Sequence, residues 1–428
     1  MPVPLLSPIM SLSLAAEQPA PPVDAEDGAW LECIECGETF APFADIRYTC
    51  DECDGLLEVR YVDLPSLDDF EGRGVWRYAD ALPLDSGVTT QEGATPLYEV
   101  PRLENDVGVE ALRIKHEGMN PTGSFKDRGM TVGVAVAKEL GVDRLACAST
   151  GNTSAALAAY GSRGGMETLV LLPAGKVAAG KIAQASLHGA RILEVDGNFD
   201  SCLDIVQELA ARGEAYLLNS LNPFRLEGQK TIGLEILEAF RDDYGAFPDR
   251  IVLPVGNAGN TSALYKAFRE LVQVGDLPLE DVPKLTGVQA AGAAPMVEAI
   301  ENDADEVRRW DDVETRATAI RIGNPVNAPK ALPGIRETDG TAVAVSDEEI
   351  TDAQRDLAEE GIGVEPASAA SIAGLRKLRA DGVVTDDERV ACLTTGHLLK
   401  DPDAAAAAGS DPQPVPNDTE GVLEHLHE

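Results

Sequence analysis

The chain has 428 residues, of which 44% are hydrophobic, and 73 acidic side chains outnumber 35 basic ones to give a formal net charge of −38. A field of that sign repels nucleic acid and excludes it as a partner. No apolar run reaches the roughly 18 residues that a membrane-spanning helix needs, so we expect a large soluble α/β protein with two domains and accessory segments.

The acidity is spread along the chain, and we interpret it as adaptation of the surface to high salt. Repulsion between like charges is then screened within a Debye length of about 3 Å at 1 M salt. A phosphorylated substrate would still need cations placed locally in so acidic a protein.

Both ends of the chain lack the pattern of a folded element. Residues 1–27 contain many apolar residues and prolines, and no Lys or Arg precedes Arg47, so the basic region of a secretory signal is missing. We expect a disordered leader, with Met10 as an alternative start, and a cytoplasmic protein. Residues 404–428 combine an alanine run with acidic, proline-containing sequence, and we expect them to be disordered or frayed.

Two Cys-x-x-Cys pairs mark residues 28–62 as a zinc-ribbon-like module. Each pair forms a tight turn that presents two thiolates, and two pairs complete a closed, structural tetrahedron. The alternatives are reduced thiols or disulfides, and a cytosolic setting disfavours disulfides. We expect zinc on these four cysteines and regard the other three cysteines as core residues; the predicted ligands are Cys33, Cys36, Cys50 and Cys53.

The stretch at 120–129, Asn-Pro-Thr-Gly-Ser-Phe-Lys-Asp-Arg-Gly, follows a predicted strand at 112–115 and precedes a predicted helix at 130–140. Lys126 would therefore lie near a helix N-terminus, which carries partial positive charge. A lysine amine can condense with an aldehyde to form a Schiff base, the resting state of pyridoxal-phosphate enzymes. The alternative is a surface lysine in a loop. Three further motifs, described below, are expected at the same site and disfavour this alternative.

Strands and helices alternate at short spacing through the rest of the chain, a pattern typical of parallel sheets with helices on both faces. We predict a large domain from residues 63–135 and 225–403 and a small domain from residues 136–224. The predicted strands lie at 145–148, 169–173, 191–195, 215–218, 250–255 and 285–289, and the predicted helices at 153–160, 178–188, 199–211, 231–240 and 261–272.

Two strand-to-helix junctions have the composition of anion sites. In Ser149-Thr150-Gly151-Asn152-Thr153, hydroxyls and backbone N–H groups can hold a substrate carboxylate, and the Asn152 amide can reach a cofactor phenolic oxygen. In Gly256-Asn257-Ala258-Gly259-Asn260, small residues let the backbone wrap around a phosphate. The second loop lacks the Gly-Lys-Ser/Thr of a Walker A motif, and an ordinary capping turn is the alternative for the first.

Two more segments complete the predicted site. Thr394 ends the last predicted strand, and its hydroxyl could meet a cofactor ring nitrogen without protonating it; a strand-end cap is the alternative. Asn219, Ser220 and Arg225 follow another strand, and arginine gives bidentate recognition of phosphate. Lys176 and Lys181 add positive charge to this set, whose alternative is ordinary surface charge.

At this point the residues resemble the threonine synthase family, which has the tryptophan-synthase-β-like fold of fold-type-II pyridoxal-phosphate enzymes, and the resemblance spans about residues 93–402. The N-terminal ribbon is similar to an extension of some prokaryotic members. The motifs that carry the resemblance occur in order as GMNPTGSFKDRGM, STGNTSAA, PAGKVAAGKIAQ, HGARILEV, PVGNAGN, IRIGNPVN, EPASAAS and TTGHLLKDP.

The resemblance implies a role for each candidate residue. Lys126 would hold the cofactor, Asn152 would contact its phenolic oxygen, Thr394 its ring nitrogen, and residues 256–260 its phosphate. Ser149 and Thr150 would help to bind the substrate. The substrate phosphate would be held by all or some of Thr153, Asn219, Ser220 and Arg225.

The implied reaction converts O-phospho-L-homoserine and water to L-threonine and phosphate by γ-elimination and β-hydration, in a monomer or homodimer. A cysteate synthase, which takes phosphoserine and sulfite, shares these motifs. A threonine or serine dehydratase needs no substrate-phosphate site, so Arg225 argues against it. A ribbon-type interaction protein with an inactive body is disfavoured by the intact Lys126 and Asn152.

Overall fold

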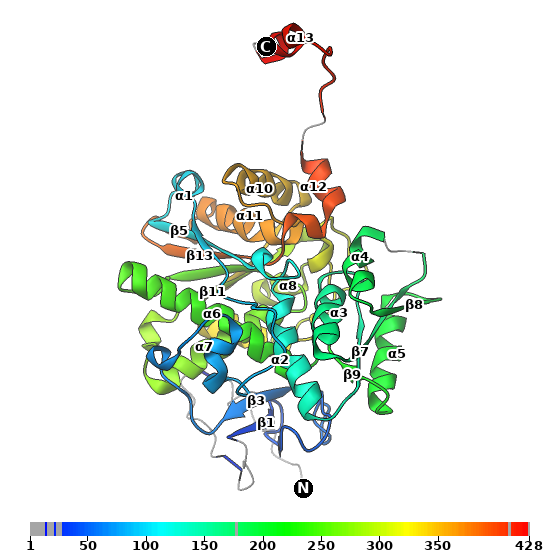
Figure 1. Ribbon diagram of the computed structural model, residues 1–428. Helices are drawn as coiled ribbons and strands as arrows, with labels where there is room; N and C mark the ends of the chain where they lie inside the picture. Colours follow the sequence, from blue (N-terminus) through cyan, green and yellow to red (C-terminus); the bar gives the residue numbers. More distant parts are fainter. Residues whose placement is uncertain (1–12, 15–20, 23–27, 176–178, 410–411, 427–428) are drawn as a thin grey trace.

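The computed structural model describes residues 13–14, 21–22, 28–175, 179–409 and 412–426 (Figure 1). Most of the predicted leader, including Met10, and Lys176 lie outside the described residues. Among the described helices, none is both long and apolar enough to cross a membrane.

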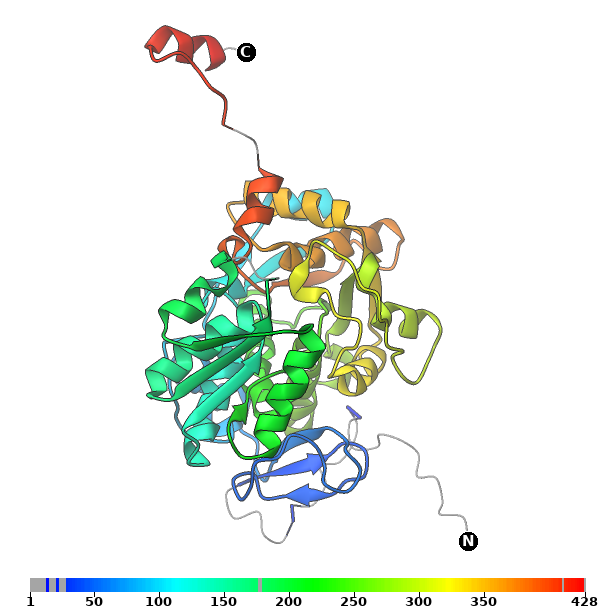
Figure 2. The ribbon, with the colours of Figure 1, turned by 90° about the vertical axis from the view of Figure 1, so that its right-hand side faces the viewer.

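The N-terminal module is a three-stranded antiparallel sheet in the order β2-β1-β3. Its strands are β1 (Ala29–Cys33), β2 (Thr39–Phe40) and β3 (Leu57–Tyr61). Every residue of β1 and β3 is buried, which an isolated small sheet could not achieve, and the module in blue indeed packs against the body below the small sheet (Figure 2). The short helices η2 (Leu67–Asp69) and η3 (Val75–Ala81) follow it.

The larger sheet of the body has six strands in the order β12-β11-β10-β13-β5-β4. All neighbours are parallel except the edge strand β4, which is antiparallel to β5. The strands are β4 (Leu97–Glu99), β5 (Ala111–His116), β10 (Arg250–Pro254), β11 (Lys284–Ala290), β12 (Thr341–Val345) and β13 (Arg389–Thr394).

Helices cover both faces of this sheet because its strands are apolar on both sides. Ile251 and Leu253 of β10 belong to one core cluster with residues of α6, α7 and α9, whereas Val252 belongs to another with residues of α1, α10 and α11. The helices are α1 (Pro101–Val107), α6 (Pro223–Tyr244), α7 (Gly259–Val274), α9 (Ala328–Glu337), α10 (Asp347–Glu359) and α11 (Pro366–Ala380).

The smaller sheet is fully parallel in the order β8-β7-β6-β9. Cys147 of β6 packs with residues of α2 and α3, and its neighbour Ala146 packs with residues of α5 on the opposite face. The strands are β6 (Arg144–Ala148), β7 (Glu167–Pro173), β8 (Arg191–Val195) and β9 (Tyr216–Leu217), and the helices are α2 (Lys126–Glu139), α3 (Asn152–Gly164), α4 (Ala179–Leu187) and α5 (Phe199–Ala211).

The structure differs from the predicted elements before residue 110, where β4 and α1 were not predicted, beyond residue 290 and at one helix start. The sequence pattern missed β12 and the helices from α8 (Pro295–Glu301) to α11, and the predicted helix at 231–240 is the middle of the much longer α6. Helix α12 (Pro402–Ala408) and helix α13 (Thr419–Leu426) lie in the segment for which we expected disorder. Figure 1 shows α13 standing away from the body.

Candidate active site

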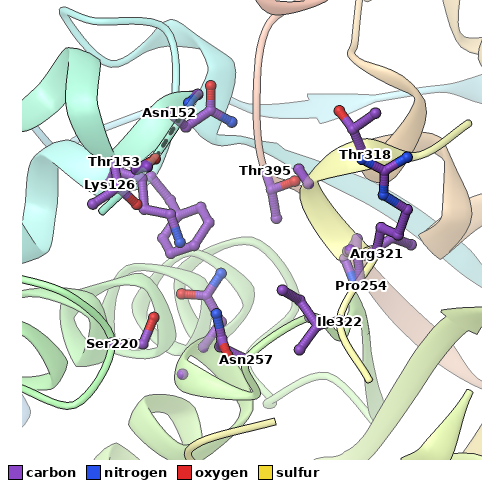
Figure 3. A pocket seen from close by; sticks show the side chains of 18 of the residues that line it. Lys126, Asn152, Thr153, Ser220, Pro254, Asn257, Thr318, Arg321, Ile322 and Thr395 are labelled. Carbon is purple, nitrogen blue, oxygen red and sulfur yellow. Dashed lines mark hydrogen bonds between the residues drawn. The ribbon is translucent and has the colours of Figure 1, made fainter. Parts of the chain in front are cut away.

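A cavity of about 490 Å³ opens where the carboxyl ends of strands from both sheets meet (Figure 3). Loops that follow parallel strands face the same edge of their sheet, which is where such folds bind ligands. The cavity is lined by residues 125–126, 148–153, 219–220, 256–260, 318–322 and 395, with further side chains from α5, α6, the start of α11 and the segment 400–403.

Lys126 is the first residue of α2 and reaches this cavity. The preceding turn is fixed by Asp127, whose carboxylate accepts hydrogen bonds from the Thr122 backbone N–H at 2.7 Å and from the Thr122 hydroxyl at 2.5 Å. Gly123 has a φ of 87°, which favours glycine. Lys126 therefore stands at the end of a rigid loop.

The Lys126 amine has no hydrogen bond or ion pair among the described residues; its Nζ lies 4.0 Å from the centroid of the Phe125 ring. Desolvation by burial, assisted by the charge of Arg225 and opposed by Glu365, lowers the pKa of Lys126 to about 7. A large share of the amine is then neutral near pH 7, as a nucleophile toward an aldehyde must be.

The loop between β6 and α3 brings residues 149–153 to the cavity. Asn152 and Thr153 lie beside Lys126 in Figure 3, and α3 begins at Asn152, so its free backbone N–H groups are available to an anion. The Asn152 Nδ2 donates to both carboxylate oxygens of Glu365, at 3.0 and 3.1 Å.

The loop between β10 and α7 forms a second anion site across the cavity. Ala258 caps the 16-residue α7 in a left-handed conformation with a φ of 60°. A Cβ added at Gly256 would lie 3.1 Å from the Ala319 carbonyl oxygen, and one at Gly259 would lie 3.1 Å from Gln229 Oε1. The glycines therefore keep the backbone close to its surroundings and leave room only for a small group.

Unpaired polar atoms around this loop indicate what that group is. The buried atoms Asn260 Oδ1, Thr261 Oγ1 and Gln229 Oε1 have no hydrogen-bond partner in the described structure. A hydroxyl can donate to an anion, and an amide can present its N–H groups after rotation. With the N-terminus of α7, these groups fit the phosphate of pyridoxal phosphate.

The structure does not bring Thr394 to the cavity. Its side chain is fully buried, and its hydroxyl lies 2.9 Å from His116 Nδ1 and 3.3 Å from the Lys115 carbonyl oxygen. Successive side chains of a strand point to opposite faces, so only one of two adjacent threonines can face the cavity, and it is Thr395 that lines it. The Thr395 hydroxyl lies 3.0 Å from Ser368 Oγ.

The predicted phosphate-binding residues are placed unequally. Asn219 and Ser220 line the cavity, but both polar atoms of the Asn219 amide bond to the backbone of Ala148, at 3.0 and 2.9 Å. Arg225 lies just outside the lining, 1% exposed, and none of its three guanidinium nitrogens has a partner in the described structure. Burial lowers the pKa of Arg225 to about 10.

Sequence reasoning missed other polar residues that line the cavity. They include Glu365, Gln229, Thr318, Arg321, Lys400 and Asp401. Glu365, Arg321 and Lys400 occur in motifs that carried the resemblance, so a signal existed, but nothing in the spacing of these residues indicated that their side chains share one space. Lys181 gives no such side-chain information, because only its backbone is described.

The four cysteines of the ribbon come together as predicted from their spacing, with ligand atoms all within 4.8 Å of one another. Cys33 Sγ lies 3.5 Å from Cys53 Sγ, and Cys36 Sγ lies 3.6 Å from Cys50 Sγ and 3.4 Å from Cys53 Sγ. A zinc–sulfur tetrahedron with bonds of about 2.3 Å has edges of about 3.8 Å, so the cluster fits zinc and is not disulfide-bonded.

Comparisons with known proteins agree with this geometry. Residues 88–396 match the family model of "Pyridoxal-phosphate dependent enzyme". The chain is 56% identical over 404 residues to the threonine synthase of Methanosarcina acetivorans, covering 92% of this chain and 98% of that relative. It is 54% identical over 391 residues to the threonine synthase of Methanocaldococcus jannaschii, covering 89% and 95%.

Solved structures share the fold at lower identity. Threonine deaminase isoform 2 from Solanum lycopersicum superposes with a TM-score of 0.61 at 22% identity, over 74% of this chain and 88% of that chain. Maize serine racemase gives a TM-score of 0.62 at 19% identity, over 78% and 94%. The chain therefore belongs to the family of pyridoxal-phosphate dependent enzymes and, within it, to the threonine synthases.

Proposed function

We propose that this chain converts O-phospho-L-homoserine and water to L-threonine and phosphate, with pyridoxal phosphate attached to Lys126. The observation that carries this proposal is one cavity that joins a lysine amine of lowered pKa to two helix N-termini, beside a buried arginine without a partner. The high identity to threonine synthases over nearly their whole length supports the same activity.

The cofactor would be held by residues from both sheets. Lys126 binds its aldehyde carbon, the backbone of residues 256–260 its phosphate, and Asn152 its phenolic oxygen. We assign the ring nitrogen to Thr395 in place of Thr394, because only Thr395 faces the cavity. When bound, the cofactor supplies an electron sink for carbanions next to its imine.

The substrate would meet two sets of groups. Ser149, Thr150 and the N-terminus of α3 bind its carboxylate, while Thr153, Ser220 and Arg225 bind its phosphate. Asn219 contributes by fixing the end of β6, since its amide is bonded to Ala148. A phosphate dianion would satisfy the buried guanidinium of Arg225, which is the reason to prefer a phosphorylated substrate over the free hydroxy-amino acid of a dehydratase.

Lys126 would also move the protons of the reaction. The Lys126 amine, neutral in part near pH 7, would take a proton from the substrate Cα and would then act at Cβ. In the net reaction Cβ would exchange a proton for the hydroxyl of water, and Cγ would exchange its phosphate for a proton, which leaves the methyl group of threonine. A phosphate retained near Arg225 would help to orient that water.

Product analysis tests the activity. The protein loaded with pyridoxal phosphate is incubated with O-phospho-L-homoserine in molar KCl, and threonine and phosphate are quantified. Equimolar threonine and phosphate are expected. Without threonine, but with intact visible absorption of the bound cofactor, phosphoserine with sulfite becomes the substrate pair to test, as for a cysteate synthase.

We further propose that the ribbon, residues 28–62, holds one structural zinc ion on Cys33, Cys36, Cys50 and Cys53. The large domain comprises residues 63–135 and 225–403, and the small domain residues 136–224. A cytoplasmic location, a homodimer and a requirement for high salt complete the proposal. Sedimentation in dilute and in molar KCl measures the last two together.

A further inference from the structure

Glu365 occupies a helix N-cap without capping the helix. It precedes the 15-residue α11, and its side chain makes no hydrogen bond to that helix. An N-cap side chain normally accepts from the first backbone N–H groups. This carboxylate instead lines the cavity, although the residue is only 5% exposed. A side chain that leaves its local role at a ligand cavity is a sign of function.

The contact that Glu365 makes is with Asn152, from the other sheet. Asn152 Nδ2 donates to both carboxylate oxygens, at 3.0 and 3.1 Å. A carboxylate only accepts, so it fixes which end of the amide faces it. The two oxygens of one carboxylate lie close together, so one N–H of Asn152 Nδ2 can be shared between them, and the second N–H then remains for another acceptor.

The surroundings are built to hold the carboxylate at this place. A Cβ on Gly396 would lie 2.5 Å from Glu365 Oε1, so only glycine leaves room there. Burial, the dominant effect, raises the pKa of Glu365, and Asp401 adds to this. The hydrogen bond from Asn152 and the positive charge that Lys400 and Lys126 can carry lower that pKa and favour the carboxylate. Glu365 in turn favours the protonated form of Lys126.

We propose that Glu365 is a positioning residue of the cofactor site, which orients the Asn152 amide toward the phenolic oxygen of pyridoxal phosphate and places its carboxylate in the same cavity as the nitrogen of Lys126. The inference deepens the proposed function and rests on it. Glu365 touches Asn152 and acts on the cofactor through it, and its charge acts on the lysine nitrogen across the cavity.

The test is a pH titration of the visible absorption of the bound cofactor, which reports the protonation of the Lys126 nitrogen without any turnover. In Glu365→Gln the shape is kept and the charge is lost, so the protonated form loses support. The titration midpoint should fall by about one pH unit, a tenfold change in proton affinity, as expected when one opposite charge is removed from the same cavity. Asp381→Asn is the matched control, because it removes one carboxylate from the exposed C-cap of the same helix.

Two further variants separate the contact from the charge. Glu365→Asp keeps the charge but withdraws from Asn152, so the midpoint should stay near that of the wild type while the cofactor dissociates several-fold more readily. If Glu365 acts on cofactor affinity through Asn152, the variant Asn152→Ala already removes that effect. The dissociation constant for pyridoxal phosphate should then be the same in Asn152→Ala and in the double variant that also carries Glu365→Asp.

Each outcome has a clear meaning. A wild-type midpoint and cofactor affinity in loaded Glu365→Gln and Glu365→Asp would overturn the inference and leave the proposed function intact. A wild-type protein that takes up no pyridoxal phosphate would overturn the proposed function, and this inference with it.

Discussion

Helix α6 carries two buried cationic side chains five positions apart, and they differ in whether acidic groups in contact with them compensate their charge. Lys230 is fully buried, and its Nζ lies 2.9 Å from Glu227 Oε2 and 2.8 Å from Glu270 Oε2. It also lies 4.4 Å from the centroid of the Tyr61 ring of the ribbon. Arg225 is equally buried but has no partner in the described structure.

The difference separates a structural charge from a ligand-binding one. Burying a charge is costly unless it is paired, so a paired cation belongs to the fold and an unpaired one is retained for something that binds. The cluster around Lys230 joins the ribbon to the body, because the Tyr61 hydroxyl donates to Glu227 at 2.6 Å. Arg225 lies near the cavity, and a bound anion there would supply the negative charge and the hydrogen-bond acceptors that its guanidinium needs.

The largest expected effect is at Lys126, whose amine also has no hydrogen bond or ion pair among the described residues. Lys126→Ala should lower kcat by about 10⁴-fold, the upper range for a positioned acid–base group, and abolish the visible absorption of the bound cofactor. Steady-state kinetics and a spectrum check this. Turnover near the wild-type rate in Lys126→Ala would show that Lys126 is not the cofactor-binding and catalytic lysine, and the comparison with the structural Lys230 would then no longer hold.

Arg225→Met should lower kcat/KM by about 10³-fold, because a buried charge contact with a ligand contributes 2–5 kcal/mol or more. The unliganded variant should be at least as stable as the wild type, since an unpaired buried charge is removed. Steady-state kinetics measure the first effect and thermal unfolding the second. With pyridoxal phosphate bound, so that the loop at 256–260 is already occupied, only the wild type should gain stability from added inorganic phosphate. Unchanged kinetics would refute the assigned role.

Lys230→Met should do the reverse. The loss of one partner leaves Glu227 and Glu270 undercompensated, and the free energy of unfolding should fall by about 3–5 kcal/mol. The kcat of the folded fraction should stay at the wild-type value. Denaturant unfolding and kinetics at low temperature are the measurements. A raised KM in the folded variant would contradict a purely structural role for Lys230.

Removal of zinc tests how much the metal contributes to the stability of the ribbon, which the Lys230 cluster joins to the body. Cys36→Ser should bind no zinc where the wild type binds one ion per chain, and the free energy of unfolding should fall by about 1–3 kcal/mol. The effect is smaller than for Lys230→Met because β1 and β3 remain buried. Metal analysis and denaturant unfolding check it. Full stability without metal would show that packing alone holds the ribbon.

The smallest effect is a shift in a pH midpoint. The pKa of Lys126, lowered to about 7 by burial and then by Arg225, predicts that the uptake of pyridoxal phosphate by the cofactor-free protein accelerates as pH rises through about 7. The amine is neutral above its pKa, so the sign is fixed. Arg225→Met removes a positive neighbour and should move the midpoint upward by less than about one unit, whereas Lys230→Met should not move it.

The local patterns of the sequence predicted the strand–loop–helix junctions well, and with them the lining residues at 149–153 and 256–260. Those junctions depend on neighbours in the chain. The choice of Thr395 over Thr394 depends on the orientation of one strand end, which two adjacent threonines do not reveal. That Arg225 lacks a partner, and that Glu365 meets Asn152, are facts of tertiary packing between different sheets.

The start of α6 is an exception, because its signal is local and the helix was still predicted to begin only at residue 231. The start of α6 at Pro223, with Asn222 accepting from the Phe224 N–H at 3.0 Å, uses ordinary capping chemistry. From the sequence we placed Arg225 after a strand, with Asn219 and Ser220, and predicted a helix only at 231–240. Arg225 lies in the first turn of α6, so the helix itself carries this binding residue.

The buried position of the Lys230 cluster has a consequence for ionic strength. Mobile ions screen charges that they can approach, and they reach fully buried pairs much less. Dissolved salt should therefore act on the acidic exterior of this chain and leave the attachment of the ribbon almost unchanged. The joint between ribbon and body would hold equally in dilute buffer and in brine, whatever the rest of the surface requires.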